Sequence, residues 1–266
     1  MRFSFELFPP KTPQATAALE AALPRLAVLN PALFTVTYGA GGTTKDGTLA
    51  TAATVAARTG VPVAAHLTYL TTPREALLAY AQDLWGRGVR HILALRGDLP
   101  PGRTFADFAG PQYFRSTAQF IAALRDVHDF EISVAAYPEV HPDAADAAED
   151  IETLKAKVAA GAERAVTQFF FDNADYWALV DRARAAGVAV PIVPGLLPVH
   201  DFPAMARFAA KCRARVPADL EARLAAEGPA AVLAAQIRDL RAQGAAHAHI
   251  YTLNRADIVE QALAKI

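Results

Sequence analysis

The sequence contains one cysteine, Cys212, and lacks a long apolar run, an excess of either charge and any low-complexity segment. One cysteine excludes an internal disulfide and a cysteine-rich metal site. The apolar runs are far shorter than the roughly 20 residues of a membrane helix, and the N-terminal segment reaches Pro9 too early for a signal peptide. With 26 basic and 27 acidic residues, the net charge of −1 provides no field for nucleic acid or anionic membranes. We therefore expect a cytoplasmic protein that binds neither.

Apolar residues make up 53% of the 266 residues and charged residues 20%, which is enough for a large core. Apolar and β-branched runs recur along the chain. The first four start roughly 30 residues apart, the length of one strand–loop–helix unit. The predicted strands are Phe3–Phe8, Leu33–Tyr38, Pro62–Tyr69, His91–Gly97, Ile132–Tyr137, Ala165–Phe171, Pro191–Leu197 and His249–Leu253.

Alanine-rich amphipathic segments lie between these strands, for example Pro73–Trp85, Ala147–Ala160 and Asn173–Ala186. Glycines that are typical of helix ends precede the next strand at Gly60, Gly88, Gly161, Gly187 and Gly244. Eight strands that alternate with eight or nine helices, without a linker, predict a single α/β domain over residues 1–266, a (β/α)8 TIM barrel. An open doubly wound sheet is the alternative, and the even alternation disfavours it.

In such a barrel the functional residues lie at the C-terminal ends of the strands, where the strand-to-helix loops converge. The N-terminal ends of the predicted strands carry little chemistry. Polar residues and one glycine gather instead at or near the C-terminal ends: Glu6, Thr37, Tyr38, His66, Arg96, Gly97, Asp98, Tyr137, His141, Gln168, Tyr251, Asn254 and Arg255. We therefore expect the site at this end of the barrel.

Glu6 stands between apolar neighbours in FSFELFPP, on a strand expected inside the barrel. A carboxylate that is buried without a partner is costly, and such a group usually takes up a proton instead. A carboxyl that stays protonated near neutral pH can serve as a general acid. The alternative is a glutamate that is paired with a basic residue at the rim of the barrel and has no catalytic part.

The motif LRGD ends the fourth strand. Arg96 can neutralise a phosphate with its planar guanidinium, Gly97 allows a ligand close to the backbone, and Asp98 can stabilise a cation. The alternative is an ordinary turn in which Asp98 caps backbone groups and Arg96 is a solvated charge. The glycine-rich loop Tyr38–Gly42 is not the dinucleotide fingerprint, since Thr44 replaces its third glycine, and it predicts only a tight loop.

The loop AAYPEVHP after the fifth strand carries Tyr137 and His141. A lone loop histidine is more often a surface residue than a ligand contact. Asp150 and Lys157 lie seven residues apart on the next helix, which is typical of a solvated charge pair. Gln168 lies in the aromatic run TQFFFD and needs a hydrogen-bond partner if it is buried.

His247 and His249 could point to one side of the last strand, as metal ligands would. They lie at the beginning of that strand, away from the expected site, and no carboxylate cluster accompanies them. We therefore expect no metal. A separate stripe with helical spacing is most simply core: Phe202, Met205, Phe208, Ala209 and Cys212.

Eight motifs, in this order and spacing, resemble the 5,10-methylenetetrahydrofolate reductases: SFELFPPK, TYGAGG, HLT, ALRGD, SVAAYPEVHP, TQFFFD, PGLLPV and YTLNR. Each motif is weak alone, but the series runs essentially end to end and is highly specific. The chain is similar to the compact bacterial type, in which no regulatory domain follows the barrel. The resemblance implies a (β/α)8 barrel with non-covalent FAD, and a folate with NADH or NADPH as small-molecule partners. It leaves open whether the chain forms a homo-oligomer.

The resemblance also implies roles for individual residues. Glu6 is similar to the family's general acid, and Asp98 to a carboxylate beside the flavin and the folate pterin. Flavin contacts are implied for Tyr38, Ala40, His66, Arg96, Gly97, Tyr137, His141, Asp150 and Lys157. Folate or nicotinamide contacts are implied for Thr37, Gln168, Phe208, Tyr251 and Arg255. For Phe208 the resemblance implies a substrate contact where spacing alone predicts a core position.

The chemistry that follows is ping-pong hydride transfer from the nicotinamide to FAD and then to the folate. The folate ring must open to an iminium, so Glu6 protonates the leaving nitrogen and Asp98 stabilises the cation. The alternatives are a catalytically silent flavin- or folate-binding barrel and another flavin barrel similar to proline dehydrogenase. A Schiff-base aldolase is disfavoured because no predicted strand contains lysine.

Two segments depart from the bacterial pattern. The loop Arg103–Tyr113 is longer and more aromatic, which puts the adenine end of the FAD site in doubt. The segment Arg215–Pro229 is shorter, which affects the contacts of the neighbouring helix and any oligomer interface there.

Overall fold

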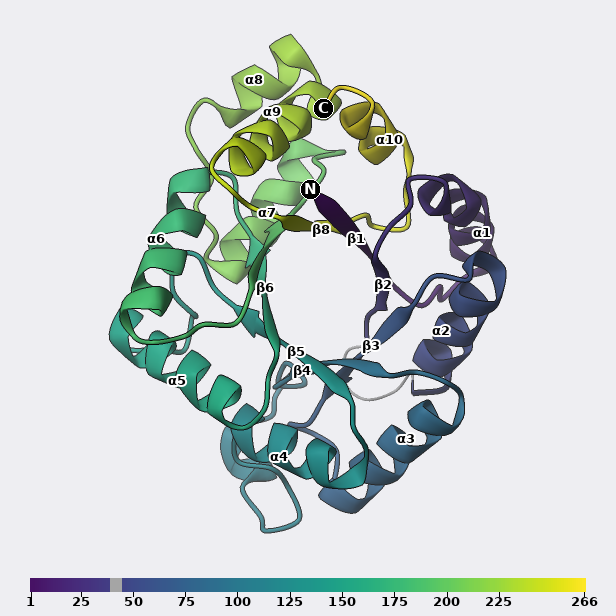
Figure 1. The fold of residues 1–266 in the computed structure, drawn as a ribbon, viewed down its shortest axis with the longest axis vertical. Coiled ribbons are helices and arrows are strands. Elements are labelled where there is room, and N and C mark those ends of the chain that lie inside the picture. The colour runs from purple at the N-terminus through teal and green to yellow at the C-terminus, as the bar shows by residue number, and fades with distance from the viewer. Residues whose placement is uncertain (39–44) are drawn as a thin grey trace.

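The strands form a closed barrel in the computed structural model, which describes residues 1–38 and 45–266. Each strand pairs in parallel with the next along the chain, and the last pairs with the first (Figure 1). The closure confirms the predicted TIM barrel and rules out the open doubly wound sheet. The strands are β1 (Arg2–Leu7), β2 (Leu33–Val36), β3 (Val63–Thr68), β4 (His91–Leu95), β5 (Glu131–Ala136), β6 (Arg164–Phe169), β7 (Ile192–Leu196) and β8 (His247–Tyr251).

Helices surround the strands on the outside of the barrel (Figure 1). The predicted glycines at their ends all have a positive φ, between 67° at Gly60 and 114° at Gly161, which glycine adopts without a steric penalty. The helices are α1 (Pro13–Ala27), α2 (Lys45–Thr59), α3 (Arg74–Gly86), α4 (Thr117–Val127), α5 (Ala147–Ala159), α6 (Asn173–Ala185), α7 (Phe202–Cys212), α8 (Leu220–Glu227), α9 (Pro229–Ala242) and α10 (Asp257–Leu263), with a 3₁₀ turn, η2 (Phe105–Phe108).

The main core lies between the strands and the helices, because alternate strand residues point outward into the helical layer. Phe5 and Leu7 of β1 are fully buried in it. The intervening residues Ser4 and Glu6 point to the barrel axis, with Glu6 beside Tyr251 of β8 in the register. The register of β1 therefore fixes Glu6 near the C-terminal end of the axis.

The strands end one or two residues earlier than predicted. Gly97 and Leu253, predicted as the last residues of two strands, have φ angles of 89° and 53° and lie beyond the ladders. Positive φ takes the chain out of the extended conformation, so the strand stops before it. In the part of the chain that the structure describes, no helix has both the length and the apolar character to cross a membrane.

Candidate active site

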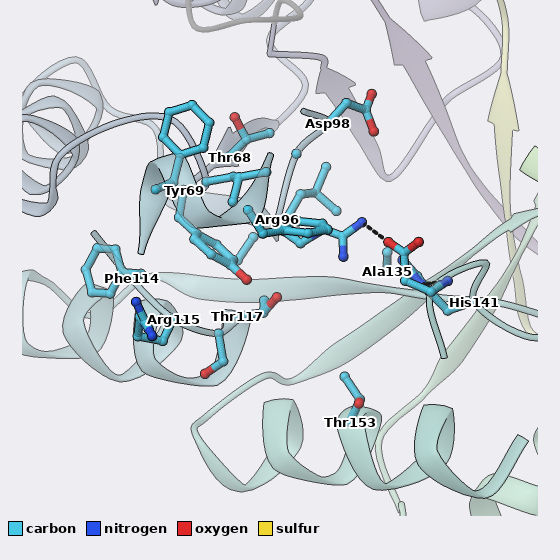
Figure 2. A pocket seen from close by; sticks show the side chains of 18 of the residues that line it. Thr68, Tyr69, Arg96, Asp98, Phe114, Arg115, Thr117, Ala135, His141 and Thr153 are labelled. Atoms are coloured by element: carbon cyan, nitrogen blue, oxygen red, sulfur yellow. Dashed lines mark hydrogen bonds and ion pairs between the residues drawn. The ribbon is translucent and has the colours of Figure 1, made fainter. Parts of the chain in front are cut away.

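A cavity of about 790 Å³ opens at the C-terminal ends of β3, β4 and β5 (Figure 2). The 3₁₀ turn η2, the start of α4 and the helix α5 complete its wall. It falls in the upper part of the roughly 300–1,000 Å³ range of small-molecule sites. Among the residues that line it are eight that the sequence singled out: Tyr38, Arg96, Gly97, Asp98, Tyr137, His141, Asp150 and Lys157. Ala40 lies outside the described residues.

Arg96 reaches from the end of β4 toward the loop that carries His141 (Figure 2). Its Nη2 donates a hydrogen bond to Asp143 Oδ2 at 2.6 Å, which lowers the pKa of Asp143. The guanidinium also lies over the ring of Phe105 in η2, 5.0 Å from the ring centroid. The Nε of Arg96 is buried and lacks a hydrogen-bond partner among the described residues. The group therefore has a spare donor in a cavity wall.

Lys157 is not the solvated charge that the spacing predicts. Its ammonium donates to the carbonyl of Ala135 at 3.0 Å, at the end of β5. Burial lowers the pKa of Lys157 to about 8, partly opposed by the negative charge of Asp150. The lysine is therefore a cation at neutral pH whose charge is poorly solvated, which is a good counterpart for an anionic ligand.

His141 is likewise tied into the cavity wall and is not a free surface residue. Its backbone N–H donates to Asp150 Oδ2 at 3.1 Å, and its Nδ1 accepts from the backbone N–H of Asp143 at 3.0 Å. The ring meets that of Tyr137 edge-on, with centroids 4.5 Å apart. Burial lowers the pKa of His141, and the charge of Arg96 lowers it further. His141 is therefore neutral at pH 7.

Gly97 is required by packing inside the protein. A Cβ at this position would lie 2.8 Å from the Cβ of Thr68 on β3. The sequence interpretation, that this glycine makes room for a ligand, missed this neighbour. Asp98 follows with an exposed side chain, and it points away from Arg96 in Figure 2. No hydrogen bond from the described residues holds its carboxylate, so the turn-capping alternative is wrong.

Glu6 lies apart from the cavity wall, inside the mouth of the barrel. Its Oε2 is 3.5 Å from Nε2 of His66 on β3 and 3.8 Å from Nε2 of His249 on β8. Burial lowers the pKa of His66 to about 4, although Glu6 partly opposes the shift. His66 is therefore neutral at pH 7 and is not the basic rim partner that the alternative required. His66, matched to a flavin contact, lies against Glu6 and not among the cavity residues.

A column of polar side chains continues below Glu6 along the barrel axis. Ser4 Oγ lies 2.8 Å from Nδ1 of His249 and 3.0 Å from Nε2 of His247. The two histidines thus share a serine, as neighbours on the inner face of β8. Within the described residues no group of three or more histidine, cysteine, aspartate or glutamate side chains is placed to hold a metal ion.

The residues matched to the substrates lie on the other side of the mouth, along β6, α7 and β8. Phe208 is 47% exposed and stacks on Phe169, with centroids 5.2 Å apart. The core prediction from spacing holds for Met205 and Ala209, which are buried, and is wrong for Phe208. A residue at the edge of an apolar helix face has the same spacing along the sequence as the core residues, but its side chain can remain exposed.

Gln168 and Tyr251 face the same mouth. Gln168 Oε1 accepts the backbone N–H of Phe169 at 3.0 Å, so the amide hydrogens remain for another acceptor. The hydroxyl of Tyr251 donates to the carbonyl of Thr167 at 2.6 Å, and burial raises its pKa well above the usual value. Tyr251 is therefore a fixed, neutral wall of the mouth.

Arg255 and Thr37 take more peripheral positions. Arg255 is exposed and pairs with Asp257 at 2.9 Å, two residues along the chain. The backbone N–H of Thr37 donates to the carbonyl of Leu7 at 2.9 Å, which ties the end of β2 to the end of β1. Neither residue is in contact with the cavity.

Several residues of the site carry no signal that the sequence alone reveals. Asp143 is one of many acidic residues in its segment, and only the fold brings it to Arg96. Gly195 on β7 has no positive φ, yet a Cβ there would lie 2.2 Å from the carbonyl oxygen of Thr167 and 2.8 Å from the ring of Tyr251. Phe105 has no motif of its own in its aromatic loop, and in the structure it lines the cavity next to Arg96.

Comparison with known proteins shows the family of the chain. The family model of methylenetetrahydrofolate reductase matches residues 1–266. The chain belongs to this family. Among curated methylenetetrahydrofolate reductases, those of Salmonella typhimurium and Escherichia coli are each 41% identical over 264 residues, covering 96% of this chain and 87% of the relative. An NADH-type methylenetetrahydrofolate reductase of Arabidopsis thaliana is 34% identical and is covered over 46% of its length.

Among solved structures, a Clostridium thermocellum protein described as binding two copies of 5-methyl-5,6,7,8-tetrahydrofolic acid has a TM-score of 0.69. The match covers 99% of this chain and 93% of that protein, and at 12% identity it shows a shared fold. As a methylenetetrahydrofolate reductase, the protein is an oxidoreductase that reduces 5,10-methylenetetrahydrofolate. The alternative of a proline-dehydrogenase-like enzyme is therefore wrong.

Proposed function

We propose that this methylenetetrahydrofolate reductase binds FAD non-covalently in the cavity and takes its hydride from NADH or NADPH in a ping-pong cycle. The observation that carries the proposal is the composition of the cavity wall. It combines two cations, Arg96 and Lys157, with the aromatic rings of Phe105, Phe114 and Tyr137. A flavin dinucleotide needs both, because its diphosphate is anionic and its two ring systems are flat and apolar.

The residues present fit the cofactor. The buried Nε of Arg96 lacks a partner, and a phosphate oxygen would accept its hydrogen bond. The ammonium of Lys157 is poorly solvated at the end of β5, so a nearby anion would stabilise its charge. Phe105 of the longer loop lies beside Arg96 and offers a face for the adenine. FAD would supply a hydride carrier that the nicotinamide reduces and the folate oxidises.

The folate half of the reaction needs a proton, and in this proposal Glu6 gives it. The protonated carboxyl transfers a proton to the leaving nitrogen of the folate five-membered ring, whose C–N bond breaks to leave an iminium. The hydride then adds to the methylene carbon, and Glu6 remains as a carboxylate. His66, 3.5 Å from Glu6, is neutral and so supplies no positive charge beside this carboxyl.

Asp98 and the residues across the mouth complete the substrate site. The unpaired carboxylate of Asp98 faces the cation that forms on ring opening and stabilises it electrostatically. Phe208 is exposed on α7 and packs on the flat ring of either substrate in turn. Gln168 offers its amide hydrogens to the pterin or the nicotinamide, and Tyr251 and Arg255 lie on the folate side.

Anaerobic spectroscopy of the purified protein tests the proposal. The protein reconstituted with excess FAD should be yellow, should bleach with NADH or NADPH, and should regain its colour with methylenetetrahydrofolate. Reconstitution with FMN, which lacks the adenylate, is the matched control and should give weaker binding. A protein that retains no flavin, or bleached flavin that the folate leaves reduced, would contradict the proposal.

A further inference from the structure

The turn that follows β8 has an unusual backbone. Leu253 and Asn254 are consecutive and both left-handed, with φ angles of 53° and 56°. This region is uncommon for side chains other than glycine, and asparagine is among the residues that tolerate it best. Leucine has no such tolerance, and Leu253 is also 45% exposed. The conformation of Leu253 is therefore unfavourable in itself, and the contacts that hold it are made by the residues on either side.

This conformation turns two buried polar side chains onto β1. The hydroxyl of Thr252 donates to the carbonyl of Glu6 at 2.6 Å. The amide of Asn254 accepts the backbone N–H of Phe8 at 3.0 Å and donates to the carbonyl of Phe8 at 2.9 Å. Thr252 is fully buried and Asn254 is 3% exposed. The backbone is thus held at Glu6 itself and again two residues later.

The carboxylate of Glu6 has no comparable support. No hydrogen bond from the described residues reaches it, and its neighbours His66 and His249 lie 3.5 and 3.8 Å away. With weak contacts at its tip, the position of this side chain depends on where its backbone is held. The ladder of β1 ends at Leu7, where Thr37 holds the strand on the β2 side, and the turn after β8 supplies the hold on the β8 side.

We infer that Thr252 and Asn254 are positioning residues that place the Glu6 carboxyl for proton transfer to the folate. The inference rests on the proposed function, in which Glu6 is the general acid. It explains why a strained turn is kept at this point, since the strain is what aims both polar side chains at β1. Neither residue touches substrate or cofactor in this account, so both act through Glu6 alone.

The expected effect is confined to one half-reaction. A reacting group that is misplaced by about 1 Å can lose on the order of 100-fold in rate. Transfer of hydride from the nicotinamide to the flavin involves no proton from Glu6. Loss of the Thr252 or Asn254 hydrogen bonds should therefore slow flavin reoxidation by the folate about 10- to 100-fold and leave flavin reduction near the wild-type rate.

Anaerobic stopped-flow on the FAD-loaded enzyme tests this with three variants. Thr252→Val removes the hydroxyl at nearly constant volume, and Thr252→Ser should restore most of the rate. Asn254→Gly removes both amide hydrogen bonds and keeps the left-handed backbone accessible, so it tests the amide and not the turn. Tyr176→Phe is the matched control, because it removes a buried hydroxyl that donates to the strand carbonyl of Ile192 at 2.8 Å, away from the mouth.

A double variant shows whether the effect passes through Glu6. In a Glu6→Gln background, which has no acid to position, Thr252→Val should cause no further loss of folate reoxidation. Full additivity of the two changes would overturn the inference. Equal slowing of both half-reactions would overturn it too, as would a normal rate of flavin reoxidation in the Thr252→Val and Asn254→Gly variants. A near-normal rate of flavin reoxidation in the Glu6→Gln single variant would instead overturn the proposed role of Glu6.

Discussion

The pH dependence of flavin affinity should report the charge of Lys157. Burial against the end of β5 lowers the pKa of Lys157 to about 8, with Asp150 raising it and Arg96 lowering it. If the diphosphate of FAD lies beside this ammonium, the cofactor binds the protonated lysine and keeps it protonated. Above the pKa of the free protein, binding must therefore take up a proton, and affinity falls as the pH rises.

The pKa sets the size of the effect. A group with a pKa of about 8 is about nine-tenths protonated at pH 7 and about one-tenth at pH 9, so FAD should bind about tenfold more weakly at pH 9. His141, the other titratable base in the wall, has a pKa lowered from its usual value and so does not change charge in this range. The hydrogen bond from Arg96 lowers the pKa of Asp143, so Asp143 keeps its negative charge across this range.

The affinities come from titrations of FAD with the apoprotein between pH 6.5 and 9.5, followed by the quenching of flavin fluorescence. The ionic strength is held constant, because salt screens the attraction between the charges. Lys157→Arg is the control, because arginine keeps its charge across this range and should remove the slope. Lys157→Met should bind FAD weakly at every pH. An affinity for the wild-type protein that is flat or rises with pH would refute the placement of the diphosphate beside Lys157.

Three further changes test the rest of the site. Arg96→Ala should weaken FAD retention by on the order of 1.5–3 kcal/mol, seen in the same titration, because it removes a charge-assisted hydrogen bond; unchanged retention would remove Arg96 from the cofactor site. Asp98→Asn should slow flavin reoxidation by the folate more than flavin reduction, and equal losses would indicate a structural role. Gly195→Ala should lower the free energy of unfolding by about 1–3 kcal/mol in denaturant titrations, since its Cβ meets the carbonyl of Thr167 and the ring of Tyr251; unchanged stability would show that β7 can shift.

The fold was predictable because its signal repeats. Each strand is apolar on the face that the helices cover, and the predicted glycines that follow helices have the positive φ expected of a helix end, as at Gly88 and Gly187. The ends of the strands were less predictable, because composition does not show where the chain leaves the ladder. Leu253 has the composition of a strand residue and the backbone of a turn.

The site was predictable in part for a related reason. The rule that places function at the C-terminal strand ends selected Glu6 and Arg96 without any structure. It could not select Asp143, whose contact with Arg96 spans 47 residues of sequence. Lys157 was interpreted as a solvated charge because helical spacing does not reveal what a side chain reaches. The exposure of Phe208, likewise, depends on the edge of α7 on which it lies.

The most direct measurement of the central claim is the pair of half-reactions of Glu6→Gln. Glutamine keeps the shape of the side chain and its hydrogen-bonding reach but cannot donate a proton as an acid. The variant should bind FAD and accept hydride from the nicotinamide at close to the wild-type rate. Its flavin should be reoxidised by methylenetetrahydrofolate about 10²–10⁴-fold more slowly than in the wild-type protein, or slower still. Folate affinity, measured separately, should change little. Reoxidation by the folate at a near-normal rate would contradict the account, and would leave Glu6 as a partly buried neighbour of His66 and His249 with no part in the chemistry.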